Sequence, residues 1–399
     1  MIKKKISLIP RYNWDYKFSD FGKAFVAVFG STINSEKSFE KVFDQKPILT
    51  TSGRTSLYAI LKSLNIPKGS YIGVPLFSCP VVFDAIRQAD LIPKFIDIEL
   101  DDYNLSVSDL KKKKDLLSAI IVIHMFGHPA DMDSISTICK GIPVVEDCAQ
   151  SLFSQYKGRY TGFQSTASFF SFRSGKYISA GEGSAIFCQD PSHYESINKM
   201  VGTLAEWKFY QEILHCAATY LKSTLYHRPW YATIGYPIGR RIDKKINLTA
   251  KTGFKLNKIY KSDWRIISER IETFVPKINR QRQNAFHLLE NVRIHNAFLP
   301  YEREKCHSNY YQFAIRFKTS EQRNLVSDYL LQHGIDTAKY LDDVVDIVKE
   351  QYGYNGDCLN AERCAKTVLV IPHHYTLSAQ DLDYIVHTLN EADRLFRDQ

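Results

Sequence analysis

The chain has 399 residues, of which 44% are hydrophobic and 24% are charged, with a formal net charge of +9. This length suffices for two domains, and the composition is ordinary for a soluble globular protein. The eight cysteines include no CxxC pair and no zinc-type spacing with histidines, and no apolar run reaches the roughly eighteen residues of a membrane span. Because the N-terminus also lacks the apolar core of a signal peptide, we expect a cytoplasmic protein without a metal site.

The first elements form an entry segment and a helix that begins with small polar residues. Residues 10–48 are rich in aromatic side chains and contain a short helix near 35–43. Residues 49–57 (LTTSGRTSL) open a helix whose apolar residues keep helical spacing up to Leu64. Serine, threonine and glycine at a helix start form either an anion site or a plain N-cap. Both interpretations remain open on these residues alone.

Strands and helices alternate from residue 71 to residue 147. The expected strands cover 71–75, 92–96, 118–124 and 142–145, and the expected helices cover 81–89, 105–112 and 132–140. Short apolar strands separated by helices predict a parallel sheet with both faces covered. Ligands of such sheets lie beyond the carboxyl ends of the strands. Asp147, His124 and the loop 75–77 fall at these ends, so we expect the site there.

The stretch 144–183 joins a strand-end acid to a lysine in a tight polar loop. Asp147 ends an apolar run, and Lys176 lies between the aromatic strand 167–172 and the glycine-bracketed Glu182. A buried acid and a loop lysine suit a pyridoxal phosphate enzyme, because the lysine amine condenses with the aldehyde while the acid keeps the pyridine nitrogen protonated. Taken singly, each residue is more often a helix cap or a solvated charge.

Residues 203–262 carry most of the excess positive charge. This basic aromatic insertion contains eleven basic and three acidic residues, a net charge of +8. Its first part, 207–225, favours a helix, and the part from Arg240 to Lys261 has little periodicity. Three interpretations stay open: a solvated or oligomer-contact insertion, a surface for anionic lipid, and a clamp on an anionic substrate. Nucleic acid is not expected as a partner because no reading motif accompanies the charge.

A second, smaller unit follows the insertion. An apolar helical stripe runs from Trp264 to Leu289, and the strand 310–317, the helix 321–333, the strand 367–371 and the helix 379–395 come after it. We therefore expect an α/β protein with a large cofactor-binding domain over 1–270 and a small C-terminal α+β domain over 271–399.

Several motifs, in this order and spacing, resemble one family over nearly the whole chain. They are TSGRTSL (51–57), IGVPLFS (72–78), FIDIELDDYNLS (95–106), IVIHMFGHPADMDSI (121–135), VVEDCAQS (144–151), YKGRYTG (156–162), SFFSFRSGKYISAGEGSAIF (168–187) and NAERCAKTVLVIPHH (360–374). The chain is similar to the pyridoxal-phosphate-dependent sugar-nucleotide aminotransferases of the DegT/DnrJ/StrS group. The resemblance implies the fold type I architecture, with a mostly parallel seven-stranded sheet flanked by helices.

The resemblance also implies roles for three residues of the stretch 144–183. Lys176 would be the catalytic lysine, holding the cofactor covalently and carrying the proton. Asp147 would pair with the pyridine nitrogen, and Gln150 would lie near the ring and its phenolic oxygen. These are the expected cofactor-binding residues around the ring.

The phosphate of the cofactor would lie at the start of the helix that begins near residue 53. The resemblance assigns it to Gly53, Arg54 and Thr55, with Ser171 as a further ligand. This agrees with the helix N-terminus being favourable for a dianion.

Three positions depart from the family pattern. Cys79 stands where the family has an aromatic residue that stacks on the ring, and Phe77 or Phe83 could replace it. Asp263 stands where the family has an asparagine that reaches the phosphate from the neighbouring subunit, so either Arg54 offsets its charge or Asp263 turns away. The basic insertion is also longer than expected.

The implied reaction is a two-stage transfer of an amino group, with glutamate as the expected donor. The acceptor would be a keto-sugar, most simply a nucleotide-linked one, in surface polysaccharide or aminosugar biosynthesis, and the enzyme would be a homodimer. A sugar dehydratase of the same family would carry histidine in place of Lys176. A catalytically retired relative that binds partners through its basic insertion is the alternative from another class, and contact with a membrane through 203–262 stays open.

Overall fold

A seven-stranded sheet forms the centre of the computed structural model, which describes residues 8–30, 36–239, 254 and 256–396. The strand order is β1-β9-β8-β5-β4-β2-β3. The strands are β1 (Ile48–Thr50), β2 (Tyr71–Pro75), β3 (Ile92–Ile96), β4 (Leu117–Ile123), β5 (Val144–Asp147), β8 (Ala167–Ser171) and β9 (Ser184–Cys188). Neighbours from β3 to β8 are parallel, whereas β9 is antiparallel to β8 and β1. The expected mostly parallel sheet is confirmed.

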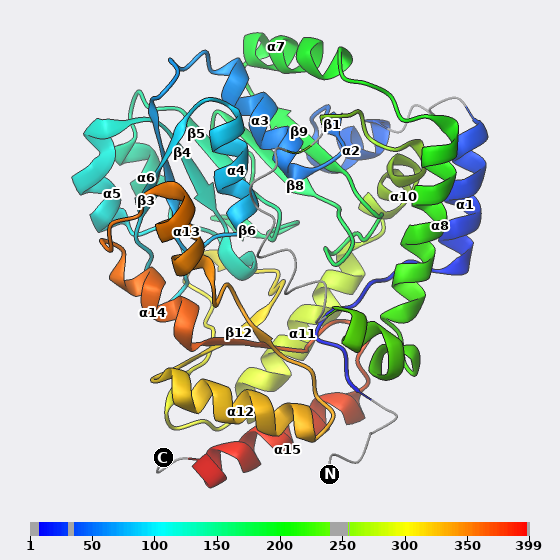
Figure 1. Ribbon diagram of the computed structural model, residues 1–399, viewed down its shortest axis with the longest axis vertical. Coiled ribbons are helices and arrows are strands. Elements are labelled where there is room, and N and C mark those ends of the chain that lie inside the picture. The colour runs from blue at the N-terminus through cyan, green and yellow to red at the C-terminus, as the bar shows by residue number, and fades with distance from the viewer. Residues whose placement is uncertain (1–7, 31–35, 240–253, 255, 397–399) are drawn as a thin grey trace.

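Helices cover the large sheet, as the alternating pattern predicts (Figure 1). They are α2 (Glu36–Phe43), α3 (Gly53–Ser63), α4 (Pro80–Gln88), α5 (Val107–Lys113), α6 (Met132–Ile138) and α7 (Pro191–Gly202), with 3₁₀ turns η1 (Lys114–Leu116) and η2 (Met125–Gly127). The apolar strand residues Ile72, Val74, Ile121 and Val145 are buried between these layers. This burial follows from parallel strands being covered on both faces.

Residues beyond 270 build a smaller antiparallel sheet with helices on it. Its strands follow the order β10-β12-β14-β13, formed by β10 (Ala297–Phe298), β12 (Phe313–Phe317), β13 (Ala338–Lys339) and β14 (Val368–Ile371). The helices are α11 (Val275–Asn291), α12 (Ser320–Gln332), α13 (Val344–Tyr352), α14 (Leu359–Thr367) and α15 (Ala379–Phe396). The division at residue 270 stays a prediction. The N-terminal Ile9 forms a bridge with Ile335 and packs into the core of this smaller unit.

The stripe expected to run from Trp264 to Leu289 is two helices. The first is α10 (Lys261–Ile271), and α11 starts at Val275 with Pro276 in its first turn. Proline has no N–H to donate and is tolerated only in the first turn of a helix, so the helix is interrupted between Ile271 and Val275. The hydrophobic period continues across the break because both helices face the core.

The described part of the insertion is helical and packs against the N-terminal segment. It contains α8 (Phe209–Leu225) and the π-helical turn η3 (Tyr231–Gly235). Beside α8 lies α1 (Phe18–Phe29), a helix that the sequence analysis had treated as entry segment (Figure 1). Residues 240–253 and 255, including Lys244 and Lys245, lie outside the described residues. No helix that the structure describes combines the length and apolarity needed to cross a bilayer.

A small three-stranded sheet completes the fold near the site. It is formed by β11 (Cys306–His307), β6 (Gln155–Tyr156) and β7 (Arg159–Tyr160), in that order. It joins the smaller unit to the segment that follows β5.

Candidate active site

A cavity of about 350 Å³ lies at the carboxyl ends of the parallel strands. Its lining brings together segments from both ends of the chain. From the sequence-predicted set, the lining includes Gly53, Arg54, Asp147, Gln150, Ser171 and Lys176. Thr55 is buried and is not part of the lining. A cavity of this size is typical of a small-molecule or cofactor site.

Asp147 is the last residue of β5 and is buried. Its Oδ1 accepts a hydrogen bond from the Ala149 amide at 2.9 Å. Burial raises the pKa of Asp147, and the positive charge of Lys176 offsets part of that rise. A carboxyl group with one hydrogen bond in a dry site can still accept a further donor, such as a protonated ring nitrogen.

Lys176 lies on a turn that several contacts fix. Its amide donates to the Arg173 carbonyl at 2.9 Å, and its carbonyl accepts from the Ser179 hydroxyl at 3.0 Å. The preceding Gly175 has φ +88, and a side chain there would meet the indole of Trp14 at 3.1 Å. Only glycine adopts this φ without strain, so Gly175 allows the tight turn that directs Lys176 into the cavity.

The Lys176 ammonium lies 4.8 Å from the centre of the Tyr311 ring. Burial and, to a lesser extent, the positive charge of Arg173 lower the pKa of Lys176 to about 8, although the Asp147 carboxylate opposes this shift. Desolvation and a neighbouring cation both disfavour the charged amine. The side chain is therefore available as a neutral nucleophile and proton acceptor near neutral pH.

The N-terminus of α3 opens into the same cavity. Ser52 caps the helix, since its side chain accepts from the Thr55 amide at 3.3 Å. A Cβ at Gly53 would lie 3.2 Å from the Phe169 ring, so the backbone approaches β8 closely. The exposed Arg54 guanidinium lies 5.3 Å from the Phe254 ring centre. Free helix N–H groups beside an arginine make a favourable place for a phosphate dianion.

Gln150 is held by hydrogen bonds at both ends of its amide. Its Oε1 accepts from the Phe126 amide at 3.0 Å, and its Nε2 donates to the Tyr340 hydroxyl at 3.0 Å. Tyr340 lines the cavity too. The Gln150 amide therefore has a fixed orientation beside the cavity. A side chain that positions a cofactor ring needs such a fixed orientation.

The candidates for ring stacking lie in different places. Phe77 is buried against Tyr103, Phe126 and Tyr340 and does not line the cavity. Phe83 packs in the core and is likewise absent from the lining, whereas Cys79, the N-cap position of α4, belongs to it. Neither phenylalanine therefore replaces the missing aromatic residue.

Asp263 is buried within this chain. Its carboxylate accepts from the Glu182 amide at 2.9 Å and lies 2.7 Å from His215 Nε2 on α8. The His215 ring stacks on Tyr260 with centroids 3.8 Å apart. Burial by itself would lower the pKa of His215, but the negative charge and hydrogen bond of Asp263, with other nearby acids, outweigh it, so the pKa is raised. Burial raises the pKa of Asp263. Of the two possibilities considered for Asp263, this geometry agrees with the side chain turning away from the phosphate.

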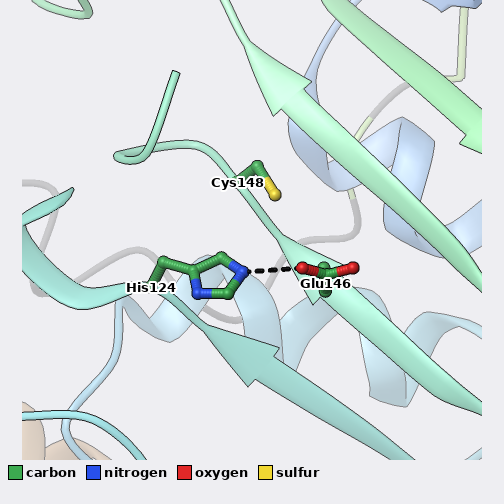
Figure 2. A group of neighbouring side chains, drawn as sticks. All are labelled: His124, Glu146 and Cys148. Carbon is green, nitrogen blue, oxygen red and sulfur yellow. Dashed lines mark hydrogen bonds and ion pairs between the residues drawn. The ribbon is translucent and has the colours of Figure 1, made fainter. Parts of the chain in front are cut away.

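His124, which the sequence also places at a strand end, belongs to a buried polar cluster beside the cavity. Figure 2 shows it with Glu146 and Cys148. The His124 Nδ1 accepts from the Ala130 amide, so its Nε2 donates to Glu146, 2.9 Å away. Glu146 also accepts from the amides of residues 162 and 164. His124 and Glu146 are thus paired with each other and with backbone amides, and we interpret them as a structural network.

The sequence analysis missed the residues that approach the cavity from remote segments. They are Arg11, Tyr12, Trp14, Tyr226, Tyr311, Gln312 and Tyr340. Trp14 and Tyr226 stack on each other with ring centroids 4.1 Å apart and planes inclined by 3°. No local motif marks these residues, because they meet only when the N-terminal segment, the insertion and the smaller unit fold together.

The comparisons with known proteins agree with this arrangement. The model of the DegT/DnrJ/EryC1/StrS aminotransferase family matches residues 29–222 and 243–390. The GDP-perosamine synthase of Escherichia coli O157:H7 is 26% identical over 346 residues, which are 86% of this chain and 84% of that protein. A putative pyridoxal phosphate-dependent aminotransferase of Bacillus subtilis, EpsN, is 28% identical over 48% of this chain and 53% of its own length.

Solved structures share the fold at lower identity. The aminotransferase TlmJ from Streptoalloteichus hindustanus gives a TM-score of 0.79 at 19% identity, covering 98% of this chain and 100% of that one. The DesV structure of S. venezuelae gives 0.78 at 20% identity, covering 97% and 99%. A GDP-4-keto-6-deoxymannose-3-dehydratase gives 0.76 at 19% identity, covering 96% and 100%. The fold is thus shared by an aminotransferase and a dehydratase.

Proposed function

Because the chain belongs to the DegT/DnrJ/EryC1/StrS aminotransferase family, we propose that it transfers an amino group from glutamate to a nucleotide-linked keto-sugar. The enzyme is an aminotransferase, and its cofactor is pyridoxal phosphate. GDP-perosamine synthases among its relatives support a nucleotide-linked sugar as the acceptor. The product would be an aminosugar for a surface polysaccharide or a related pathway.

One observation carries the proposal: the Lys176 amine, with its pKa lowered to about 8, shares a cavity with the buried Asp147 and the N-terminus of α3. The cofactor fits these residues. Its phosphate would lie on the Gly53 and Arg54 amides, and its ring nitrogen would donate to Asp147. When bound, it supplies an electron sink that stabilises negative charge at the substrate carbon.

The side chains of the site then have separate tasks. Lys176 would hold the cofactor through its Nζ, and the same amine would carry the proton of the reaction. Asp147 would keep the ring nitrogen protonated through its negative charge, and Gln150 would help to orient the ring. Ser171 and Thr55 complete the phosphate site, Ser171 from the cavity wall and Thr55 by supporting the Ser52 cap.

A lysine at position 176 favours transamination over dehydration, because the family's dehydratases carry histidine there. The alternative of a catalytically retired relative is opposed by the retention of Asp147, Gln150 and Lys176 around one cavity. We also propose that the protein forms a homodimer and that it works in the cytoplasm. The eight unpaired cysteines support the cytoplasmic location, because a reducing compartment keeps thiols free. Contact of residues 203–262 with a membrane is proposed on their positive charge.

Absorption spectroscopy tests the proposal. Protein incubated with pyridoxal phosphate should show a band at about 400–430 nm that borohydride removes, and glutamate should shift it toward about 330 nm. A nucleotide-linked keto-sugar added afterwards should restore the first band. Lys176→Ala should lack the borohydride-sensitive band, while Lys366→Ala, an exposed lysine of the smaller unit, should keep it. A protein that takes up no cofactor would contradict the assignment.

A further inference from the structure

The exposed apolar side chains of this protein gather on one edge. Among the described residues, 21 large hydrophobic side chains are exposed, and eleven of them lie within 18–29 and 209–238. These eleven are Phe18, Phe25, Val26, Phe29, Phe209, Tyr210, Leu214, Leu221, Trp230, Ile234 and Ile238. The two helices that carry most of them, α1 and α8, pack side by side at the margin of the molecule (Figure 1). We call this surface the α1–α8 face.

The exposed residues follow helical spacing on both helices. On α8, Tyr210, Leu214 and Leu221 are exposed together with the alanines 217 and 218. On α1 the exposed residues are 18, 19, 22, 23, 25, 26 and 29, and the large apolar ones among them are 18, 25, 26 and 29. Residues three, four and seven apart share one side of a helix, so each helix turns a continuous apolar stripe outward. A soluble monomer seldom exposes such a contiguous surface without a partner.

Charge is distributed unevenly across the same two helices. The acid of α1, Asp20, turns inward and binds the Arg270 guanidinium at 2.7 Å. The acid of α8, Glu212, is buried and accepts from the Lys261 amide at 3.0 Å. Exposed lysines stand at the ends of the stripes, at 17, 208 and 222, and Lys23 within α1 is exposed as well and pairs with Glu269 at 2.6 Å. The α1–α8 face is therefore apolar in its centre and positive at its border.

We propose that the α1–α8 face binds the surface of an anionic lipid bilayer, with its phenylalanines and leucines at the acyl boundary and its lysines among the headgroups. Aromatic and aliphatic stripes bordered by lysines are the pattern of interfacial helices. A second copy of this chain is a poorer occupant, since a two-fold contact would bring the same lysines together. The proposal does not depend on the aminotransferase reaction.

Contact with lipid would also set the place of the active site. The α8 helix ends at Leu225, and its cap residue Tyr226 lines the cavity that contains Lys176. The cavity thus lies at one end of the proposed membrane-binding helix, and the enzyme would work close to the bilayer surface.

Vesicle flotation of the cofactor-loaded protein tests the proposal. Vesicles of phosphatidylcholine with about one third phosphatidylglycerol should carry the protein upward, and pure phosphatidylcholine should bind it more weakly. Leu214→Glu combined with Leu221→Glu should reduce binding at least tenfold. Leu359→Glu is the matched control, because Leu359 is 70% exposed on the remote α14, and it should bind normally. Retained cofactor absorption checks that each variant is folded.

A second pair of variants tests the charged border. Lys17→Glu combined with Lys222→Glu should weaken binding to the anionic vesicles, and added salt should shrink the difference from the unaltered protein. Lys349→Glu, on α13, should have no effect. Absence of flotation with both kinds of vesicle would overturn the proposal. It would also be overturned if the Leu214 and Leu221 substitutions changed only the oligomeric mass, because the face would then be an interface between copies.

Discussion

Replacing Arg173 with glutamine should raise the pKa of Lys176 and slow the capture of the cofactor. Burial and the Arg173 charge lower this pKa to about 8 from an ordinary value of 10.5. At pH 7.5 an amine of pKa 8 is neutral in about a quarter of the molecules, against about one in a thousand at the ordinary value. Loss of one exposed, partly screened cation should raise the pKa by about half to one unit.

The expected consequence is a three- to tenfold slower attachment at pH 7.5, because only the neutral amine attacks the aldehyde. Stopped-flow absorbance of apoprotein mixed with pyridoxal phosphate, followed from pH 6.5 to 10, gives the midpoint directly. Arg54→Gln is the control, since Arg54 is not among the causes of the Lys176 shift. It should weaken cofactor affinity and leave the midpoint unchanged. An unaltered midpoint in Arg173→Gln would show that desolvation alone sets the pKa.

Three further predictions concern the same region. Lys176→Met should stabilise the apoprotein at pH 7 by up to about 3 kcal/mol, because the folded state disfavours the charged amine. This gain in unfolding free energy should be complete below pH 8 and should vanish as the pH rises to 10.5. Urea unfolding measured across this pH range tests it. Asp147→Asn should retain the cofactor and lower the rate of amino transfer on the order of 100-fold, measured as single-turnover absorbance with glutamate. Asp263→Ala leaves His215 and the Glu182 amide unpaired, so it should cost about 3 kcal/mol of folding free energy in thermal melts. Cofactor affinity in that variant should stay normal at low temperature, and a large loss of affinity would place Asp263 at a phosphate.

The sequence allowed the central sheet and the local part of the site to be predicted. Asp147 and Lys176 stand out because each lies next to a clear structural signal, a strand end or a glycine-rich turn. The helix α1 was missed because apolar residues lie on its exposed side as well as on its buried side, so the sequence lacks the usual contrast between an apolar and a polar face. β1 was missed because three residues are too short to show a period.

The aromatic wall of the cavity could not be predicted from any one stretch. Trp14 and Tyr226 are more than two hundred residues apart, and their stacking depends on how the insertion packs against the N-terminal segment. For Asp263 the sequence predicted the position in the chain but not the direction of the side chain. Its position in the family pattern was clear, but only the tertiary contact with His215 decides where its carboxylate points.

The pairing of Ile9 with Ile335 has a consequence for the timing of assembly. Residues 11, 12 and 14 line the cavity, and the bridge at Ile9 joins this segment to one made late in synthesis. A chain emerging from the ribosome can form β1 to β9 early, since domains generally fold from the N-terminus onward. Trp14 gains its stacking partner Tyr226 earlier, but Arg11 and Tyr12, next to the Ile9 bridge, reach their places only after residue 335 has left the exit tunnel. Cofactor retention is therefore a property of the finished chain, and nascent fragments that stop before residue 335 would be expected to leave this side of the site open to water.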